Sequence, residues 1–384
     1  MLKRNLQIVL PQGKSAFLWG PRKTGKSTYL KENFKDSIYY DFLKTDLLFD
    51  FIKAPSLLRE QLSAENERNA IKNPVILDEV QKVQGILDEV HWLIENSGMS
   101  FILCGSSARK LKHGNANMLG GRAWRYEMMP FTLNELGSPD LIKAVNSGLI
   151  PEHYSEENYI RSLKSYVQDY LKEEIISEGA VRNMRAFTDF LDAAAFSNGE
   201  VVNYSNIARD CGIDSKTVKD YFLILQDTLL GYMVEPYTKK GKRDSVLKSP
   251  KFYFFDTGII SALTGRRIMD MTGTDFGRAF EHLIFMELKA YSSYSGKDLD
   301  ISYWRTRGGS EIDFVLGKGE TVLEIKSGAK VSESKLRNIK YFQKQYAPLK
   351  NFVVCNEKVP RKSGEILLLP WKEFIDRLWA GEVV

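Results

Sequence analysis

Cysteine, histidine and long apolar runs are scarce in this chain. Its 384 residues include three cysteines, Cys104, Cys211 and Cys355, which lie far apart and form no C-x-x-C pair. Neither a disulfide framework nor a zinc site is therefore predicted. No uninterrupted apolar stretch approaches the roughly 18 residues that a membrane span requires. With no internal repeat or low-complexity tract either, the sequence is unlike a membrane protein, a disulfide-stabilised scaffold or a repeat array.

The composition is that of a soluble globular protein. Hydrophobic residues make up 43% and charged residues 27% of the chain, and its length suits two or three domains. The net charge of +5 says little about partners. In the N-terminal stretch MLKRNLQIVL, polar residues interrupt the apolar run and no small-residue cleavage site follows. We therefore expect a cytoplasmic protein with no membrane partner.

A glycine loop, GPRKTGKST, occupies residues 20–28 and predicts a nucleotide site. It follows the apolar run 16–19 and precedes a helix-compatible stretch, which is the strand–loop–helix setting of a phosphate-binding loop. Its backbone N–H groups and the new helix would cradle the phosphates of ATP. Lys26 would reach the β- and γ-phosphates, and Ser27 would bind Mg²⁺. The predicted nucleotide-binding residues are Gly20, Pro21, Arg22, Lys23, Thr24, Gly25, Lys26, Ser27 and Thr28.

Two further apolar runs predict strands of the same parallel sheet. VILDE, residues 75–79, reads as a buried strand that ends in two carboxylates, of which Asp78 would join the Mg²⁺ shell and Glu79 would polarise the attacking water. SFILC, residues 100–104, ends in GSS, where Ser106 is placed to sense the γ-phosphate or the lytic water. A Ser-rich turn that caps the following helix is an equally good interpretation of Ser106. Downstream, LGGR offers Arg122 on a flexible loop, as an arginine finger requires.

Together these motifs resemble those of the bacterial and archaeal AAA-type ATPases that carry a fused C-terminal half. The resemblance rests on the phosphate loop and on VILDEV, LCGSSARKL, GGRAWRYEMMPFTLNEL, YVQDYLKEEI, NYSNIARDCGI and YWRTRGGSEIDF. It implies a homo-oligomeric ATPase in which an arginine finger acts on the neighbouring subunit, a role that falls on Arg122. No second sensor arginine is recognisable after Phe131.

The middle of the chain predicts a winged helix. After long helices over 155–196, residues 206–218 read as a helix, a glycine turn and a second helix capped by Asp214 or Ser215. The second helix would lead with Lys216 and Lys219. Strands over 229–234 and 251–255 would flank a wing whose tip is basic. The tip residues are Lys239, Lys240, Lys242 and Arg243. This wing predicts contact with a DNA backbone, or alternatively a solvated turn on a domain that binds proteins.

The last part of the chain predicts a nuclease-like site. A helix over 276–288 places Glu281 on its apolar stripe, while Glu287 can face water. Strands 311–316 and 321–326 form a hairpin whose alternation should send Ile312, Phe314, Leu323 and Ile325 to one face. The opposite face would carry Asp313, Glu324 and Lys326.

An acidic residue followed by E-x-K is the constellation of the restriction-endonuclease-like fold. Glu281, Asp313 and Glu324 would hold Mg²⁺, and Lys326 would position the attacking water. The alternative is a degenerate nuclease fold that retains an ion-pair cluster.

The sequence as a whole predicts an α/β protein of three domains. They are a P-loop AAA-type ATPase domain (1–150), a helical linker with a winged helix-turn-helix (151–262), and a restriction-endonuclease-like domain (263–384). We expect Mg²⁺-dependent ATP hydrolysis that drives or gates action on DNA. Two rival hypotheses are an ATP-controlled switch that binds a protein partner and carries an inert nuclease fold, and a DNA-binding regulator with vestigial ATPase chemistry.

Overall fold

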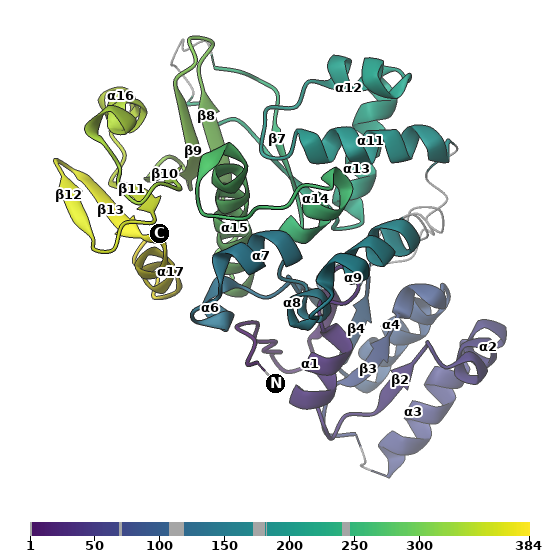
Figure 1. Ribbon diagram of the computed structural model, residues 1–384. Helices are drawn as coiled ribbons and strands as arrows, with labels where there is room; N and C mark the ends of the chain where they lie inside the picture. The colour runs from purple at the N-terminus through teal and green to yellow at the C-terminus, as the bar shows by residue number, and fades with distance from the viewer. Residues whose placement is uncertain (1, 69–70, 107–118, 172–180, 182, 240–245) are drawn as a thin grey trace. The chain divides into compact units, whose positions relative to one another are not determined.

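The computed structural model describes residues 2–68, 71–106, 119–171, 181, 183–239 and 246–384 (Figure 1). The chain divides into two compact units. The N-terminal unit comprises Lys3–Pro130 with Asp227–Leu229, and the C-terminal unit comprises Phe131–Gln226 and Leu230–Val384 with Leu2. No helix of the described part is long and apolar enough to cross a membrane.

The N-terminal unit is a parallel α/β sheet. Its five strands lie in the order β2-β3-β4-β1-β5, and each neighbouring pair is parallel. The strands are β1 (Ser15–Trp19), β2 (Tyr39–Asp41), β3 (Val75–Asp78), β4 (Phe101–Gly105) and β5 (Ala123–Glu127). The helices are α1 (Lys26–Asn33), α2 (Thr45–Lys53), α3 (Leu57–Glu67), the single turn η1 (Val80–Lys82) and α4 (Ile86–Ser97).

One face of this sheet forms a core with α2, α3 and α4. Phe17 of β1, Leu77 of β3 and Leu103 of β4 are fully buried there, packed with side chains such as Leu58 and Val90 from the helices. Because β1 and β3 are buried along their whole length, their apolar runs are continuous rather than alternating. The strands predicted around 16–19, 75–79 and 100–104 are all present, and their carboxyl ends meet at one edge of the sheet.

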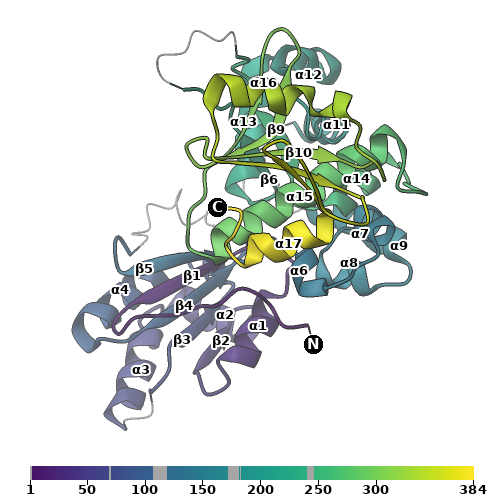
Figure 2. The ribbon, with the colours of Figure 1, turned by 90° about the vertical axis from the view of Figure 1, so that its left-hand side faces the viewer.

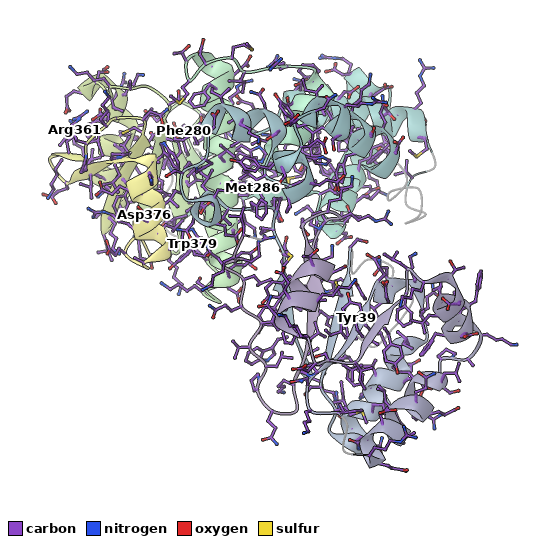
Figure 3. The ribbon with its side chains drawn as sticks, turned by 60° about the horizontal axis from the view of Figure 1, so that its bottom comes forward. Tyr39, Phe280, Met286, Arg361, Asp376 and Trp379 are labelled. Carbon is purple, nitrogen blue, oxygen red and sulfur yellow. The ribbon has the colours of Figure 1, made fainter. Side chains whose placement is uncertain are left out.

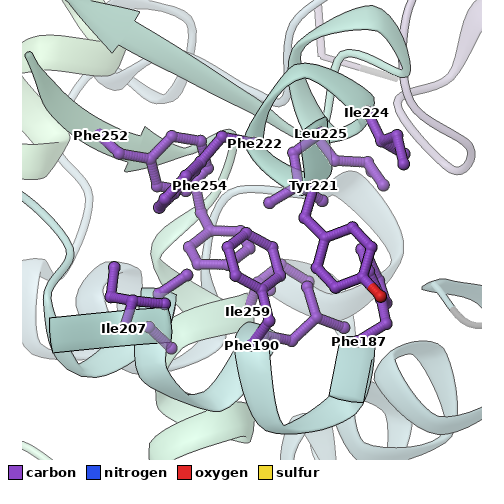
Figure 4. Close-up of a cluster of buried hydrophobic side chains, with 14 of the residues drawn as sticks. Phe187, Phe190, Ile207, Tyr221, Phe222, Ile224, Leu225, Phe252, Phe254 and Ile259 are labelled. Atoms are coloured by element: carbon purple, nitrogen blue, oxygen red, sulfur yellow. The ribbon is translucent and has the colours of Figure 1, made fainter. Parts of the chain in front are cut away.

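The first part of the C-terminal unit is helical and includes a short antiparallel hairpin. Its elements are α6 (Leu133–Leu136), α7 (Leu141–Ser147), α8 (Pro151–Ser155), α9 (Tyr159–Ser165), η2 (Tyr166–Leu171), α11 (Met184–Phe196), α12 (Tyr204–Cys211), α13 (Ser215–Asp227), β6 (Gly231–Val234), β7 (Lys251–Phe254) and α14 (Thr257–Thr264). A glycine turn at Gly212 joins α12 to α13, and Asp214 caps α13 by accepting from the backbone N–H groups of Lys216 and Thr217. Figure 4 shows the aromatic core of this region, with Phe190 of α11 edge-on to Phe222 of α13.

The second part of the C-terminal unit is a mixed sheet in the order β12-β13-β11-β10-β9-β8. Strands β8, β9 and β10 pair in antiparallel fashion, whereas β10, β11 and β13 run parallel. Its elements are α15 (Gly273–Tyr294), β8 (Ile301–Arg305), β9 (Glu311–Leu316), β10 (Thr321–Lys326), η3 (Glu333–Leu336), α16 (Arg337–Tyr346), β11 (Lys350–Cys355), β12 (Arg361–Ser363), β13 (Ile366–Pro370) and α17 (Trp371–Trp379). Helix α16 lies on one face of this sheet, with α15 and α17 on the other (Figure 2).

Residues 131–150 lie with the C-terminal unit, although the sequence suggested a boundary at 150. The reason is a set of long-range hydrogen bonds: Leu149 donates its backbone N–H to buried Asp256 (2.6 Å), and the Thr257 hydroxyl donates to the Ala144 carbonyl (3.0 Å). Beyond this difference, the three-domain division stays a prediction.

Glu287 is buried, which contradicts the prediction that it faces water. Its carboxylate accepts hydrogen bonds from the backbone N–H of Leu133 (2.7 Å) and from Nε1 of Trp379 (2.6 Å). Figure 3 labels Trp379 on α17. Helical periodicity shows only which face a residue occupies, and here the polar face of α15 is itself covered by α6 and α17.

The simple alternation predicted for β9 is also wrong. Ile312 packs in the core beneath α16, whereas Phe314 stacks on Phe285 of α15. The side chain of Asp313 accepts the backbone N–H of Ile325 (2.6 Å) beyond the last paired residues, Phe314 and Leu323. The pairing of β9 with β8 is also irregular here: Ser302 pairs with Val315 but Trp304 pairs with Ile312, so β9 has one extra residue between them, and such a bulge breaks the period of two.

Candidate nucleotide and C-terminal sites

The phosphate loop has the backbone geometry that an anion cradle needs. Gly25 begins α1 with φ 92°, and no side chain caps this helix. Its N-terminal N–H groups are therefore directed toward the loop, where they can bind phosphate oxygens. Gly20 has φ 155°, and a Cβ atom there would lie 2.4 Å from the Met128 carbonyl oxygen. Only glycine fits this approach of the loop to the end of β5.

Lys26 is held inside the loop. Its Nζ donates to the carbonyl oxygens of Gly20 (2.7 Å) and Pro21 (2.9 Å), and only 6% of the residue is exposed. Arg4 braces the same loop from outside, because its guanidinium donates to the carbonyls of Thr24 (2.8 Å) and Met129 (2.6 Å). Sequence reasoning did not find Arg4, which lies in no motif.

Asp78 and Ser27 are connected by Tyr39, a residue that the sequence motifs did not reveal. The hydroxyl of Tyr39, on β2, donates to Asp78 Oδ2 (2.5 Å), and the Ser27 side chain hydrogen-bonds the same hydroxyl. Burial, together with the Asp78 carboxylate, raises the pKa of Tyr39, so its hydroxyl stays a donor. Asp78 Oδ1 accepts the backbone N–H of Glu79 (3.1 Å), which leaves this buried carboxylate oriented by two uncharged donors.

Glu79 is held in place by Gln81 in the turn η1. Gln81 Nε2 donates to Glu79 Oε2 (2.6 Å) and to the Ser106 hydroxyl (3.2 Å), so one amide connects the ends of β3 and β4. Glu79 has φ 60°, a left-handed conformation that costs a residue with a Cβ atom about 1–3 kcal/mol. Burial raises the pKa of Glu79, while the Lys26 ammonium opposes this shift. The structure brings the predicted residues Lys26, Asp78, Glu79 and Ser106 together at one edge of the sheet.

Arg122 lies apart, in the turn before β5. Its guanidinium forms an ion pair with Glu95 of α4 and donates to the Gly120 carbonyl (3.2 Å). With 37% of its side chain exposed, it lies at the surface of the unit. The arginine-finger role stays a prediction.

In the C-terminal unit, Glu281 lies in a mixed cluster of acids and a lysine. Its Oε1 accepts from the hydroxyl of Tyr253 (2.5 Å) and from Nζ of Lys251 (3.3 Å), both on β7. The same Nζ lies 2.7 Å from Glu311 Oε1 on β9. Burial raises the pKa of Glu281 to about 6, with Lys251 opposing the shift. Neither Lys251 nor Glu311 was predicted, because no local motif marks them.

The other predicted acids form a second ion pair nearby. Lys326 Nζ lies 2.7 Å from Glu324 Oε2 and 3.9 Å from Asp313 Oδ2. Within the described part of the chain, Glu324 Oε1 is buried without a hydrogen-bond partner, and burial followed by the proximity of Asp313 raises the pKa of this carboxyl well above its usual range. A cavity of about 150 Å³ is lined by Lys251, Glu281, Glu311 and Asp313, together with Asn198, Gly199, Glu200 and Arg278.

These acids do not form a ready cation site. Among the residues that the structure describes, no group of three or more histidine, cysteine or acidic side chains is placed to hold a metal ion. Both pairs of carboxylates instead surround a lysine. The metal-ligand role of Glu281, Asp313 and Glu324 therefore stays a prediction, and the geometry supports no step that runs through a metal there.

The predicted DNA-contact lysines are at the surface where they are described. Lys216 and Lys219, on the first turns of α13, are exposed, as is Lys239 in the segment that follows β6. The Lys219 ammonium lies over the Tyr204 ring, 5.2 Å from its centroid. Lys240, Lys242 and Arg243 lie outside the described residues.

The N-terminal unit has the features of a P-loop nucleotide-binding domain. These are a parallel sheet, a helix that begins directly after a glycine loop, and acidic residues at the end of β3. Sequence comparison agrees: residues 12–137 match the family described as "AAA domain". The chain thus carries a domain of a general nucleotide-hydrolase class at its N-terminal part. Residues 139–269 and 276–374 match two families described as domains of unknown function, DUF8612 and DUF4143.

Two relatives match most of this chain at low identity. An uncharacterized protein of Methanocaldococcus jannaschii is 23% identical over 391 residues, covering 91% of this chain and 82% of the relative. An uncharacterized protein of Haemophilus influenzae is 22% identical over 347 residues, covering 82% of each. The similarity therefore extends across both units.

Proposed function

We propose that the chain is a Mg²⁺-dependent ATPase whose hydrolysis cycle drives or gates action on DNA. The observation that carries the ATPase proposal is the placement of Asp78, Glu79 and Ser106 beside the Lys26 loop. Mg²⁺ and ATP, when bound, supply the electrophilic γ-phosphorus and offset its charge. Ser27 and Asp78 are the residues that would hold the ion, and their oxygens, joined through Tyr39, suit it.

The remaining steps belong to the protein. Lys26 and the N–H groups at the start of α1 bind the phosphate oxygens, and Glu79 accepts the proton of the attacking water. Gln81 orients Glu79 from the side of Ser106. Lys26→Ala should abolish nucleotide binding and turnover, whereas Glu79→Gln should keep binding and lose turnover. Turnover of Glu79→Gln near the wild-type rate would show that Glu79 is not the catalytic carboxylate.

The arginine-finger proposal has a test that needs no structure of an oligomer. Arg122→Ala and Lys26→Ala should each be inactive alone. If Arg122 acts on a neighbouring subunit, mixing the two variants creates sites with an intact loop beside an intact arginine, and turnover returns in part. Inactivity of a mixture shown by light scattering to contain mixed oligomers would contradict the proposal.

The DNA proposal rests on the helix-turn-helix layout and its exposed lysines. Lys216→Ala with Lys219→Ala should weaken DNA binding and reduce the slope of log affinity against log salt by about 2, since each phosphate contact contributes roughly 0.9. The matched control is Lys35→Ala with Lys53→Ala, two exposed lysines of the N-terminal unit. Equal losses in both pairs would indicate only a general charge effect.

Coupling between the two activities can be measured in one reaction. ATP hydrolysis is followed with and without single- and double-stranded DNA while DNA integrity is monitored, with wild type beside Lys26→Ala and Asp313→Ala. Stimulation with Asp313-dependent cutting would support a coupled nuclease. Stimulation without cutting would support a DNA-dependent ATPase on an inert nuclease-like fold, and no response to DNA would contradict the DNA proposal.

A second candidate is an ATP-controlled switch that binds a protein partner. It is favoured by the ion pairs that Lys251 and Lys326 make with the C-terminal acids, because a neutralised acidic cluster is poorly suited to cleavage. This candidate predicts slow turnover without DNA dependence. It also predicts a defined partner that is retained by Glu79→Gln with ATP and released by Lys26→Ala.

A further inference from the structure

The strongest unexplained feature outside the nucleotide site is Lys251. Its side chain is 3% exposed, and its Nζ lies between Glu281 (3.3 Å) and Glu311 (2.7 Å). The ammonium also lies over the Tyr303 ring, 5.4 Å from its centroid. A buried ammonium is costly unless it is paired. Here two carboxylates and an aromatic face surround it, so it is held as a cation.

Three cations, Lys251, Arg305 and Lys326, lie among the acids of this region. Burial alone would lower the pKa of Lys251, but the carboxylates of Glu281 and Glu311 raise it well above its usual value. Arg305 adds a second cation beside Glu311 (3.5 Å). Lys326 faces the remaining two acids, with its Nζ 2.7 Å from Glu324 Oε2 and 3.9 Å from Asp313 Oδ2.

Lys251 reaches these acids from a strand outside the C-terminal sheet. It lies on β7, and Tyr253, two residues on and on the same side of the strand, donates to the same Glu281. The arms of this hairpin are also bonded to the edge strand β8. The Tyr237 backbone N–H donates to the Tyr303 carbonyl (2.6 Å), and the Leu247 N–H donates to the Arg305 carbonyl (2.9 Å).

We propose that Lys251 is the resident cation of the C-terminal acidic site, in place of a divalent metal, and that it locks the β6–β7 hairpin onto the C-terminal sheet. Mg²⁺ or Mn²⁺ binding would require oxygen atoms whose charge is not already neutralised, and Lys251 occupies that position between α15 and β9. The acids predicted to bind a metal are thereby assigned to an ion-pair cluster. This proposal does not depend on nucleotide hydrolysis, and its test uses no nucleotide.

The test measures Mn²⁺ binding to the whole protein by electron paramagnetic resonance. The C-terminal ion is defined as the Mn²⁺ ion whose binding is lost in Asp313→Asn. Wild type should bind no such ion. Lys251→Met should gain one ion per chain, and the double variant Lys251→Met/Asp313→Asn should lose it. Lys251→Arg, which keeps the positive charge, should gain none.

Two results would overturn the proposal: an Asp313-dependent Mn²⁺ ion in wild type, or a folded Lys251→Met protein that binds none. Circular dichroism establishes whether the variant is folded. Should Lys251→Met fail to fold, wild type and Lys251→Arg still decide the matter, because an Asp313-dependent ion in either contradicts a resident lysine cation and its absence from both supports one.

Discussion

Replacing Tyr39 with phenylalanine should weaken Mg²⁺ binding at the nucleotide site. The change removes one hydroxyl, which donates to Asp78 Oδ2 at 2.5 Å and also contacts Ser27. A hydrogen bond to a buried carboxylate contributes about 1.5–3 kcal/mol. Loss of a group that orients a metal ligand typically lowers metal affinity about 10- to 100-fold. These two figures agree, since about 1.4 kcal/mol corresponds to a factor of ten.

The assay is a Mg²⁺ titration of ATP turnover, paired with the affinity for a fluorescent ATP analogue measured with and without Mg²⁺. In Tyr39→Phe, the half-saturating Mg²⁺ concentration should rise about 10- to 100-fold, while the Mg²⁺-free affinity stays the same. Tyr40→Phe is the matched control, because the Tyr40 hydroxyl donates to Gln61 (3.0 Å) away from the site. Equal Mg²⁺ dependence in both variants would refute the reasoning, and tighter Mg²⁺ binding by Tyr39→Phe would show that the hydroxyl competes with the ion.

Three further predictions concern Gln81 and the buried acids. Gln81→Leu keeps most of the side-chain volume but removes the hydrogen bond that the Gln81 amide donates to Glu79, so the turnover number should fall about 10- to 100-fold with unchanged nucleotide affinity. A normal turnover number would contradict this. Burial raises the pKa values of Asp256 and Glu287 to about 7. Between about pH 4 and pH 7 the unfolded chain therefore loses these protons before the folded chain does. In urea denaturation, the free energy of unfolding of the C-terminal unit should fall as pH rises, by at most about 4 kcal/mol for each acid. A free energy of unfolding that increases with pH would contradict the raised pKa values. Gly148→Ala should cost at least about 2 kcal/mol in the same assay, because φ is +69° and the added Cβ would lie 1.7 Å from Asp256 Oδ1; a neutral result would contradict this geometry.

Local sequence patterns predicted the elements that carry the motifs. The strand before Gly20, the strand that ends at Asp78 and the hairpin of β9 and β10 all lie where periodicity and glycine placement indicated. In each case the signal is contained within a short window, since a buried parallel strand is a continuous apolar run and a tight turn needs glycine or a left-handed residue.

The residues that sequence reasoning missed act across long separations. Tyr39 lies in a three-residue strand and looks like ordinary core, but pairing of β2 with β3 brings it to Asp78. Lys251 lies in a basic segment that resembles the root of a wing, yet its partners are contributed by α15 and β9. No local pattern specifies such contacts, because they depend on which elements become neighbours in the folded chain.

The two acidic sites differ in the donors that hold them, and this difference bears on which of them can bind a cation. Asp78 is oriented by a tyrosine hydroxyl and a backbone N–H, both uncharged, so its negative charge remains available to an incoming ion. Glu281 accepts from the Tyr253 hydroxyl, but it also shares the Lys251 ammonium with Glu311, and this cation offsets part of their negative charge. A carboxylate held by neutral donors can support metal chemistry, whereas one held by lysine must first lose its partner. If both proposals hold, Asp78→Asn should abolish Mg²⁺-dependent turnover, and Asp313→Asn should leave the Mg²⁺ dependence of ATP turnover unchanged.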